Sequence, residues 1–118
     1  HSAEKRSRLM QAGAEVHVLP ANSEGRISLP ELLQWLAENE QVNELLVETG
    51  ATLAGALLEA NLVDELQLFV APTLLGGEAR PLFALPGITQ MADQKRLTIK
   101  ESRTVGQDWW ITATPHAD

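Results

Sequence analysis

The residues with the clearest potential for chemistry are Glu48, Gly50 and Thr52, which lie between a short apolar run and an apolar helical segment. A helix N-terminus offers unpaired backbone amides and the positive end of the helix dipole, and together these bind anions such as phosphate. A glycine in such a turn lets the backbone approach a phosphate without a Cβ in the way. The turn therefore predicts a nucleotide-binding corner. The same residues also fit a plain bend, in which Gly50 turns the chain and Thr52 caps the helix.

Glu48 is the candidate catalytic residue of this corner. It stands where the chain changes from apolar to polar residues, at the carboxyl end of a predicted strand. Ligands of open α/β sheets bind outside the carboxyl ends of the strands. A carboxylate at that position can accept hydrogen bonds from a base, a ribose or a pyrimidine-like amide. The ordinary alternative is an acidic surface residue at the end of a strand.

Alternating helical and extended segments must position these residues. Apolar residues at helical spacing predict three helices, at residues 3–12, 28–39 and 52–60. The second of these begins at a capping box formed by Ser28 and Glu31. Short apolar runs predict three strands, at residues 16–19, 45–47 and 66–71. The order α-β-α-β-α-β implies parallel strands joined by right-handed crossovers.

The character of the chain changes after Pro72. Residues 73–94 are rich in Gly and Pro and predict a long loop, and residues 97–105 and 109–114 predict an antiparallel hairpin. The expected fold is therefore an α/β fold with a mixed sheet, one domain over residues 1–118. Three parallel strands and a hairpin would leave the helix at 52–60 without full cover, and the chain opens in a helical pattern without Met. Both features favour an absent upstream part.

Composition excludes several classes of protein. The net charge of −7 disfavours nucleic acid or an anionic membrane as a partner, since both attract clustered Lys and Arg. The chain has no cysteine, which rules out disulfides and thiolate metal sites within it. No apolar stretch approaches the roughly 20 residues that span a bilayer, so we expect a cytoplasmic location. The histidines, His1, His17 and His116, have no ligand spacing, and no metal site is expected.

Three blocks of sequence resemble a known family. They are LVETGATLAGALL at residues 46–58, LVDEL at 62–66 and APTLLGG at 71–77, followed by VGQD at 105–108 before a last strand. In this order and at these separations, they are similar to the reductase domain of the bifunctional riboflavin-biosynthesis deaminase/reductase. The resemblance is strong over residues 45–114 and loose over the first forty.

The resemblance implies a dihydrofolate-reductase-like, three-layer fold and a homodimer. It implies NADPH-dependent reduction of the ribose of 5-amino-6-(5-phosphoribosylamino)uracil to a ribityl chain. Gly50, Ala51, Thr52 and Leu53 would lie along the cofactor's pyrophosphate, and Glu48 would lie near substrate and cofactor. This sequence departs from the family's usual Gly or Ala at Thr49 and from its frequent Pro at Ala51. The first half of the family's reductase domain, which supplies most substrate phosphate contacts, has no counterpart here, so this piece alone is expected to be inactive.

Two further interpretations fit the same residues. The chain can be a truncated, non-catalytic α/β module that dimerises or binds a nucleotide. It can also belong to another reductase of the same fold that acts on a pyrimidine or a pterin, because one fold hosts several functions.

Overall fold

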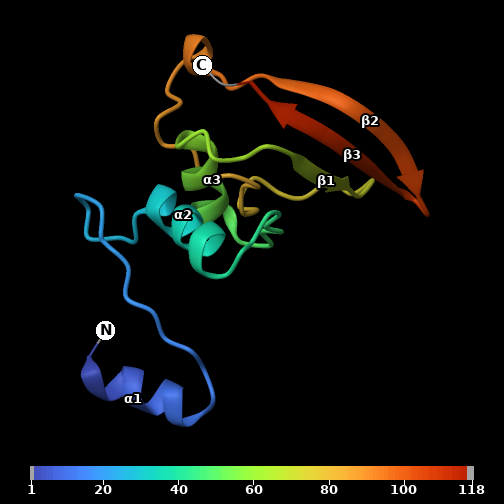
Figure 1. Cartoon of the computed structure of the whole chain (residues 1–118). Helices are drawn as coiled ribbons and strands as arrows, with labels where there is room; N and C mark the ends of the chain where they lie inside the picture. The colour runs from blue at the N-terminus through green and yellow to red at the C-terminus, as the bar shows by residue number, and fades with distance from the viewer. Residues whose placement is uncertain (1, 117–118) are drawn as a thin grey trace. The chain divides into compact units, whose positions relative to one another are not determined.

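A computed structural model describes residues 2–116 of the chain. The chain divides into two compact units, His1–Leu45 and Leu46–Asp118. The first contains helices α1 and α2, and the second contains helix α3, the 3-10 helix η1 and three strands (Figure 1).

The first unit begins with helix α1, Ala3–Gln11. The Ser2 side chain caps it by accepting a hydrogen bond from the Lys5 amide at 3.3 Å. Gly13 follows with φ +90°, a left-handed conformation that glycine adopts without steric cost. The predicted helix and its glycine stop are confirmed.

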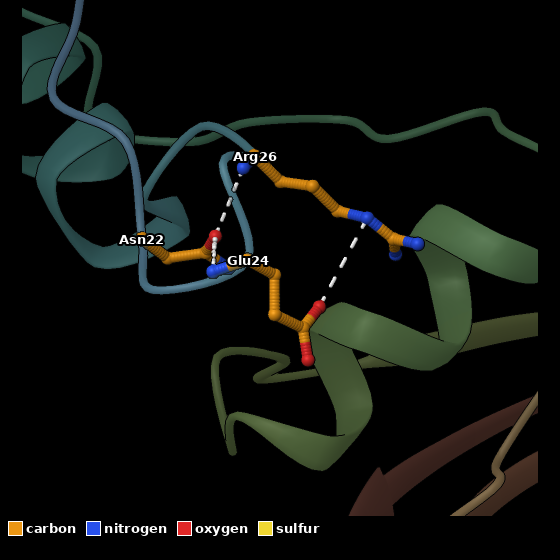
Figure 2. Close-up of polar contacts among 3 residues, drawn as sticks. All are labelled: Asn22, Glu24 and Arg26. Carbon is orange, nitrogen blue, oxygen red and sulfur yellow. Dashed lines mark hydrogen bonds and ion pairs between the residues drawn. The ribbon is translucent and has the colours of Figure 1, made fainter.

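A tight loop precedes the second helix. The Asn22 side-chain oxygen accepts hydrogen bonds from the amides of Glu24 and Arg26, at 3.0 and 2.9 Å (Figure 2). The Arg26 guanidinium lies 4.0 Å from the Glu24 carboxylate, and both side chains are largely exposed. This turn holds residues 21 and 27 together in an isolated β-bridge.

Helix α2, Leu29–Asn39, starts where the sequence predicts, with Ser28 as its N-cap. The capping box itself is wrong, because the Ser28 side chain makes no cap hydrogen bond. Pro30, at the second helical position, has no amide to donate, and the Glu31 amide that a capping box uses is not bonded to the Ser28 side chain. With 11 residues α2 is short, and within residues 2–116 no helix is long and apolar enough to cross a membrane.

The second unit joins one helix to a three-stranded sheet. Helix α3, Ala51–Glu59, is followed by β1, Leu66–Val70, and then by a long loop that contains η1, Met91–Asp93. Strands β2, Leu97–Val105, and β3, Asp108–Pro115, form the predicted hairpin. Gly106 turns it with φ +62°. The strand order is β1-β3-β2, and both pairings are antiparallel (Figure 1).

The fold is therefore a mixture of helices and an antiparallel sheet, and the expected parallel strands are not present in the described chain. Strand β1 pairs antiparallel with β3 and not with a parallel neighbour. Residues 16–19 and 45–47 have no regular secondary structure, so neither segment forms a strand. A strand needs a partner for its backbone amides and carbonyls, and composition alone does not supply one. Leu46 accordingly stays 78% exposed.

The core of the second unit is small. Among its hydrophobic side chains, Leu57, Leu58 and Ala113 are buried. The alternation of the strands places Ala113 on the same sheet face as its register partner Leu66. On the opposite face, Phe69 stacks on Trp110 with ring centroids 5.5 Å apart. Phe69 nevertheless remains 62% exposed.

Candidate functional site

The predicted nucleotide corner is the N-terminal turn of α3. Gly50, and not Thr52, is the N-cap, and Ala51, Thr52 and Leu53 form the first turn. The first hydrogen bond of the helix runs from the Ala54 amide to the Gly50 carbonyl, at 3.1 Å. The amides of Ala51, Thr52 and Leu53 have no acceptor among residues 2–116. Three adjacent donors therefore point away from the start of a helix whose first turn holds no acidic residue.

Gly50 keeps the space before this turn open. Its φ of −78° and ψ of 172° are extended values that any residue can adopt. A Cβ built on Gly50 would meet nothing within 4 Å. The fold of this chain thus places no demand for glycine at this position, and the free space is what a ligand approaching the amides would occupy.

Glu48 lies on the exposed segment that leads into this turn. No hydrogen bond or ion pair engages its carboxylate in the described part of the chain, and the side chain is exposed. Val47 before it is 42% exposed, and Leu53 after the turn is 43% exposed. The structure therefore brings together an acceptor, a set of amide donors and an apolar flank. These groups lie on an open surface. Two open hollows, of about 510 and 540 Å³, lie elsewhere, along α1.

A loop segment that the sequence did not single out lies against α3. We name residues 84–87 the strap. The Ala84 amide donates to the Ala51 carbonyl at 3.0 Å, and the Gly87 amide donates to the Glu59 carboxylate at 2.9 Å. Between these ties Gly55 is buried, and a Cβ built on it would lie 1.8 Å from the Ala84 carbonyl oxygen. No local pattern marks these contacts, because they join residues 28 or more positions apart.

His17 lies in a cluster with acidic residues, although the sequence shows no ligand spacing around it. His17 lies 3.6 Å from the Glu15 carboxylate and packs on the Trp35 ring at 4.4 Å between centroids. The ligand atoms of Glu15, His17 and Glu40 lie within 4.8 Å of one another. All three side chains are exposed, and exposed acidic groups of this kind are common without a metal ion. His1 lies outside the described residues.

Comparison with known proteins assigns the chain to a family. The family model described as the RibD C-terminal domain matches residues 1–111, which include Glu48, all of α3 and the strap. The chain belongs to the RibD C-terminal domain family. The resemblance stated from the three sequence blocks is thereby confirmed.

Two curated relatives and one solved structure illustrate the match. The riboflavin biosynthesis protein RibD of Escherichia coli is 49% identical over 84 residues, which are 71% of this chain and 23% of that protein. The 5-amino-6-(5-phosphoribosylamino)uracil reductase of Buchnera aphidicola is 32% identical over 90 residues, covering 76% of this chain and 43% of that protein. Form 2 of Acinetobacter baumannii RibD matches with a TM-score of 0.81 at 34% identity, over 94% of this chain and 29% of that one.

The chain therefore spans about a quarter of the length of the Escherichia coli RibD protein that it matches. The match to the solved RibD structure shows that the mixed α/β fold of this chain is similar to the one found in RibD.

Proposed function

We propose that the complete protein carrying this chain reduces 5-amino-6-(5-phosphoribosylamino)uracil with NADPH, as a step of riboflavin biosynthesis. The name of the Buchnera aphidicola relative supports this reaction, and the RibD relative supports the pathway. The observation in this chain that carries the proposal is the turn at Gly50, where three unpaired amides open onto free space.

The residues of the turn fit the cofactor's diphosphate. Ala51, Thr52 and Leu53 supply amide donors at the positive end of a helix dipole, and Gly50 leaves room for a phosphate to approach them. When bound, the nicotinamide supplies a hydride to the sugar C1 of the substrate. The protein contributes binding and orientation to that chemistry. Backbone amides achieve this without a cation, which suits a chain of net charge −7.

Glu48 acts on the substrate side in this proposal. Reduction adds a hydride to C1 of the open-chain imine and a proton to its nitrogen. An ionised carboxylate accepts hydrogen bonds from amide and hydroxyl donors, and the substrate offers both in its pyrimidine and its sugar. A carboxylate would repel a phosphate, so Glu48 and the amides of Thr52 and Leu53 are suited to different parts of the ligands.

The test uses the complete protein. NADPH titration should give saturable binding, and Gly50→Val and Thr52→Glu should each weaken it more than about tenfold, a loss of roughly 1.4 kcal/mol. Valine fills the open space, and glutamate brings a negative charge to the first turn. Substrate-dependent oxidation of NADPH is the second measurement. Affinity that is unchanged in both variants would remove the turn from the cofactor site.

The finer features of the fold and assembly are part of the same proposal. In the complete protein, residues 16–19 and 45–47 become strands of a dihydrofolate-reductase-like, three-layer fold with parallel strands. The exposed apolar side chains Leu46 and Val18 support this, because the layers that cover a parallel sheet on both faces would bury them. The chain is then the C-terminal part of a single reductase domain in a cytoplasmic enzyme.

The complete protein also associates with a second copy of itself in this proposal. We place the interface of a homodimer on the open sheet face, defined by Gln67, Phe69, Arg103 and Trp110. The side chains of this face contact one another: the Arg103 guanidinium lies 3.9 Å from the centroid of the Trp110 ring, and the Trp110 indole nitrogen donates to the Gln67 side chain. Aromatic and Arg side chains of this kind are enriched in protein interfaces.

A non-catalytic dimerising or nucleotide-binding module is the alternative, and the small core, with three buried hydrophobic residues among those that the structure describes, favours it for this piece alone. Two measurements separate these functions: calorimetric titration of the 118-residue chain with NADPH, and a turnover assay of the complete protein. Tight binding without turnover by the complete protein supports the module, whereas turnover by the complete protein supports the reductase.

A further inference from the structure

We infer that Gly55 and Glu59 are positioning residues, which hold the strap (residues 84–87) along α3 and thereby fix the turn that receives the cofactor. The inference rests on the proposed function and adds two residues and a loop segment to its site. Neither residue belongs to the turn itself. Their effect passes through the strap to Ala51, whose carbonyl accepts the Ala84 amide at 3.0 Å.

The contact at Gly55 is closer than any other residue allows. A Cβ there would lie 1.8 Å from the Ala84 carbonyl oxygen and 2.7 Å from its carbonyl carbon. Both are backbone atoms, so no side chain can rotate away to relieve the clash. A glycine in a helix interior costs roughly 0.5–1 kcal/mol relative to alanine. The chain accepts that cost in the middle of α3, and the gain is the close approach of the strap.

Glu59 also stands against its local preference. It is the last residue of α3, where the negative end of the helix dipole disfavours a carboxylate. Its Oε1 atom accepts the Gly87 amide at 2.9 Å, which satisfies a donor of the strap from a helix end. A residue that conflicts with local preference and makes one specific distant contact is typical of a functional position.

The geometry explains why the side chain must be long. Residues 85–88 form a turn in which the Ile88 amide donates to the Leu85 carbonyl at 3.1 Å. The Gly87 amide in this turn is reached by the Glu59 carboxylate at 2.9 Å. Aspartate is one methylene shorter, so we expect its carboxylate to stop short of this amide.

A third tie lies beyond the strap. The Lys95 ammonium group donates to the Asn61 side chain at 3.1 Å, just after α3 ends. The loop is therefore attached at the first residue of α3, at its last residue and past its end. Since the Ala51 carbonyl belongs to the turn that holds the free amides, a displacement of the strap acts through the Ala84 hydrogen bond on the direction of these amides.

The experiment compares four variants of the complete protein: Glu59→Asp, Glu59→Gln, Gly55→Ala and Glu101→Asp. Glu59→Asp keeps the charge and loses the reach, and we expect its Kd for NADPH to rise about fivefold, the effect of one lost hydrogen bond. Glu59→Gln keeps an acceptor at the same reach and should stay within about twofold of wild type. Gly55→Ala should weaken NADPH binding at least about tenfold. Glu101→Asp makes the same chemical change on the exposed strand β2 and should have no effect.

Hydrogen exchange and the separation of KM from kcat complete the test. The Gly87 amide should exchange faster in Glu59→Asp than in wild type and Glu59→Gln, and the KM for NADPH should rise while kcat changes little. If Gly55→Ala does not fold, the pair at Glu59 decides. Equal losses in Glu59→Asp and Glu59→Gln, or faster exchange at Gly87 with unchanged affinity, would overturn the inference. Absence of NADPH binding by the wild-type protein would instead refute the proposed function.

Discussion

Replacement of Gly50 by serine separates the role of this residue in folding from its role in binding. Serine is a better N-cap than glycine, and α3 has no side-chain cap hydrogen bond. Because a Cβ at Gly50 meets nothing within 4 Å and its φ is ordinary, the substitution introduces no clash or strain. We expect the free energy of unfolding to stay level or to increase by a few tenths of a kcal/mol.

The same substitution should reduce cofactor affinity. The new hydroxyl accepts a hydrogen bond from the amide of Thr52 or Leu53, the donors that a phosphate would use, and the new Cβ occupies the open space. Loss of one charge-assisted hydrogen bond corresponds to roughly 1.5–3 kcal/mol. We therefore expect the Kd for NADPH to rise about tenfold to a hundredfold in the complete protein.

Gly50→Asp extends the series with a charge. Aspartate also caps helices well, so stability should again be retained. Its repulsion of a phosphate should lower affinity further than serine does, and the difference between the two variants should shrink as salt is added. Thermal melting and calorimetric titration of wild type, Gly50→Ser and Gly50→Asp provide the comparison. Variants that are as stable as wild type and bind NADPH equally well would refute the assignment of the turn.

Three further predictions concern the complete protein. Glu48→Gln should lower kcat with little change in the Kd for NADPH, because Glu48 is placed on the substrate side; wild-type turnover in steady-state assays would exclude it from the site. Phe69→Glu should shift sedimentation velocity toward a monomer, since it places a charge on the open sheet face, whereas Glu78→Gln, in the exposed loop after β1, should leave the sedimentation unchanged. The amides of residues 45–47 should exchange slowly in the complete protein and rapidly in the 118-residue chain, and fast exchange in both would contradict the proposed parallel strands.

The elements that the sequence predicted well are those with local signals. Gly13 marks the end of α1, and Gly106 marks the turn of the hairpin, because both residues have a positive φ that glycine adopts easily. Helix α3 was predicted from its apolar composition, with its start misplaced by one residue. Gly50 and not Thr52 is the cap, since the chain there needs only an extended residue before the first helical turn.

The features that sequence reasoning missed depend on contacts between distant segments. The apolar run at 45–47 has strand composition, yet pairing depends on a neighbour and not on the run itself. Gly55 stands inside an otherwise apolar helix, and the reason for it is the distant carbonyl of Ala84. No local pattern distinguishes Glu59 from other acidic residues, because its contact lies 28 positions away. The candidate site was thus predicted at the level of its turn, and its supporting contacts were not.

The two edges of the three-stranded sheet differ in their ability to accept another strand. β2 is exposed along all nine of its residues, carries Lys100, Glu101 and Arg103, and has a register irregularity between Ile99 and Glu101. Charges and bulges on an outer strand prevent further pairing. β1, with the sequence LQLFV, has neither charge nor bulge. Any additional strand is therefore expected to join beside β1, so this hairpin terminates the sheet on one side and leaves it able to extend on the other.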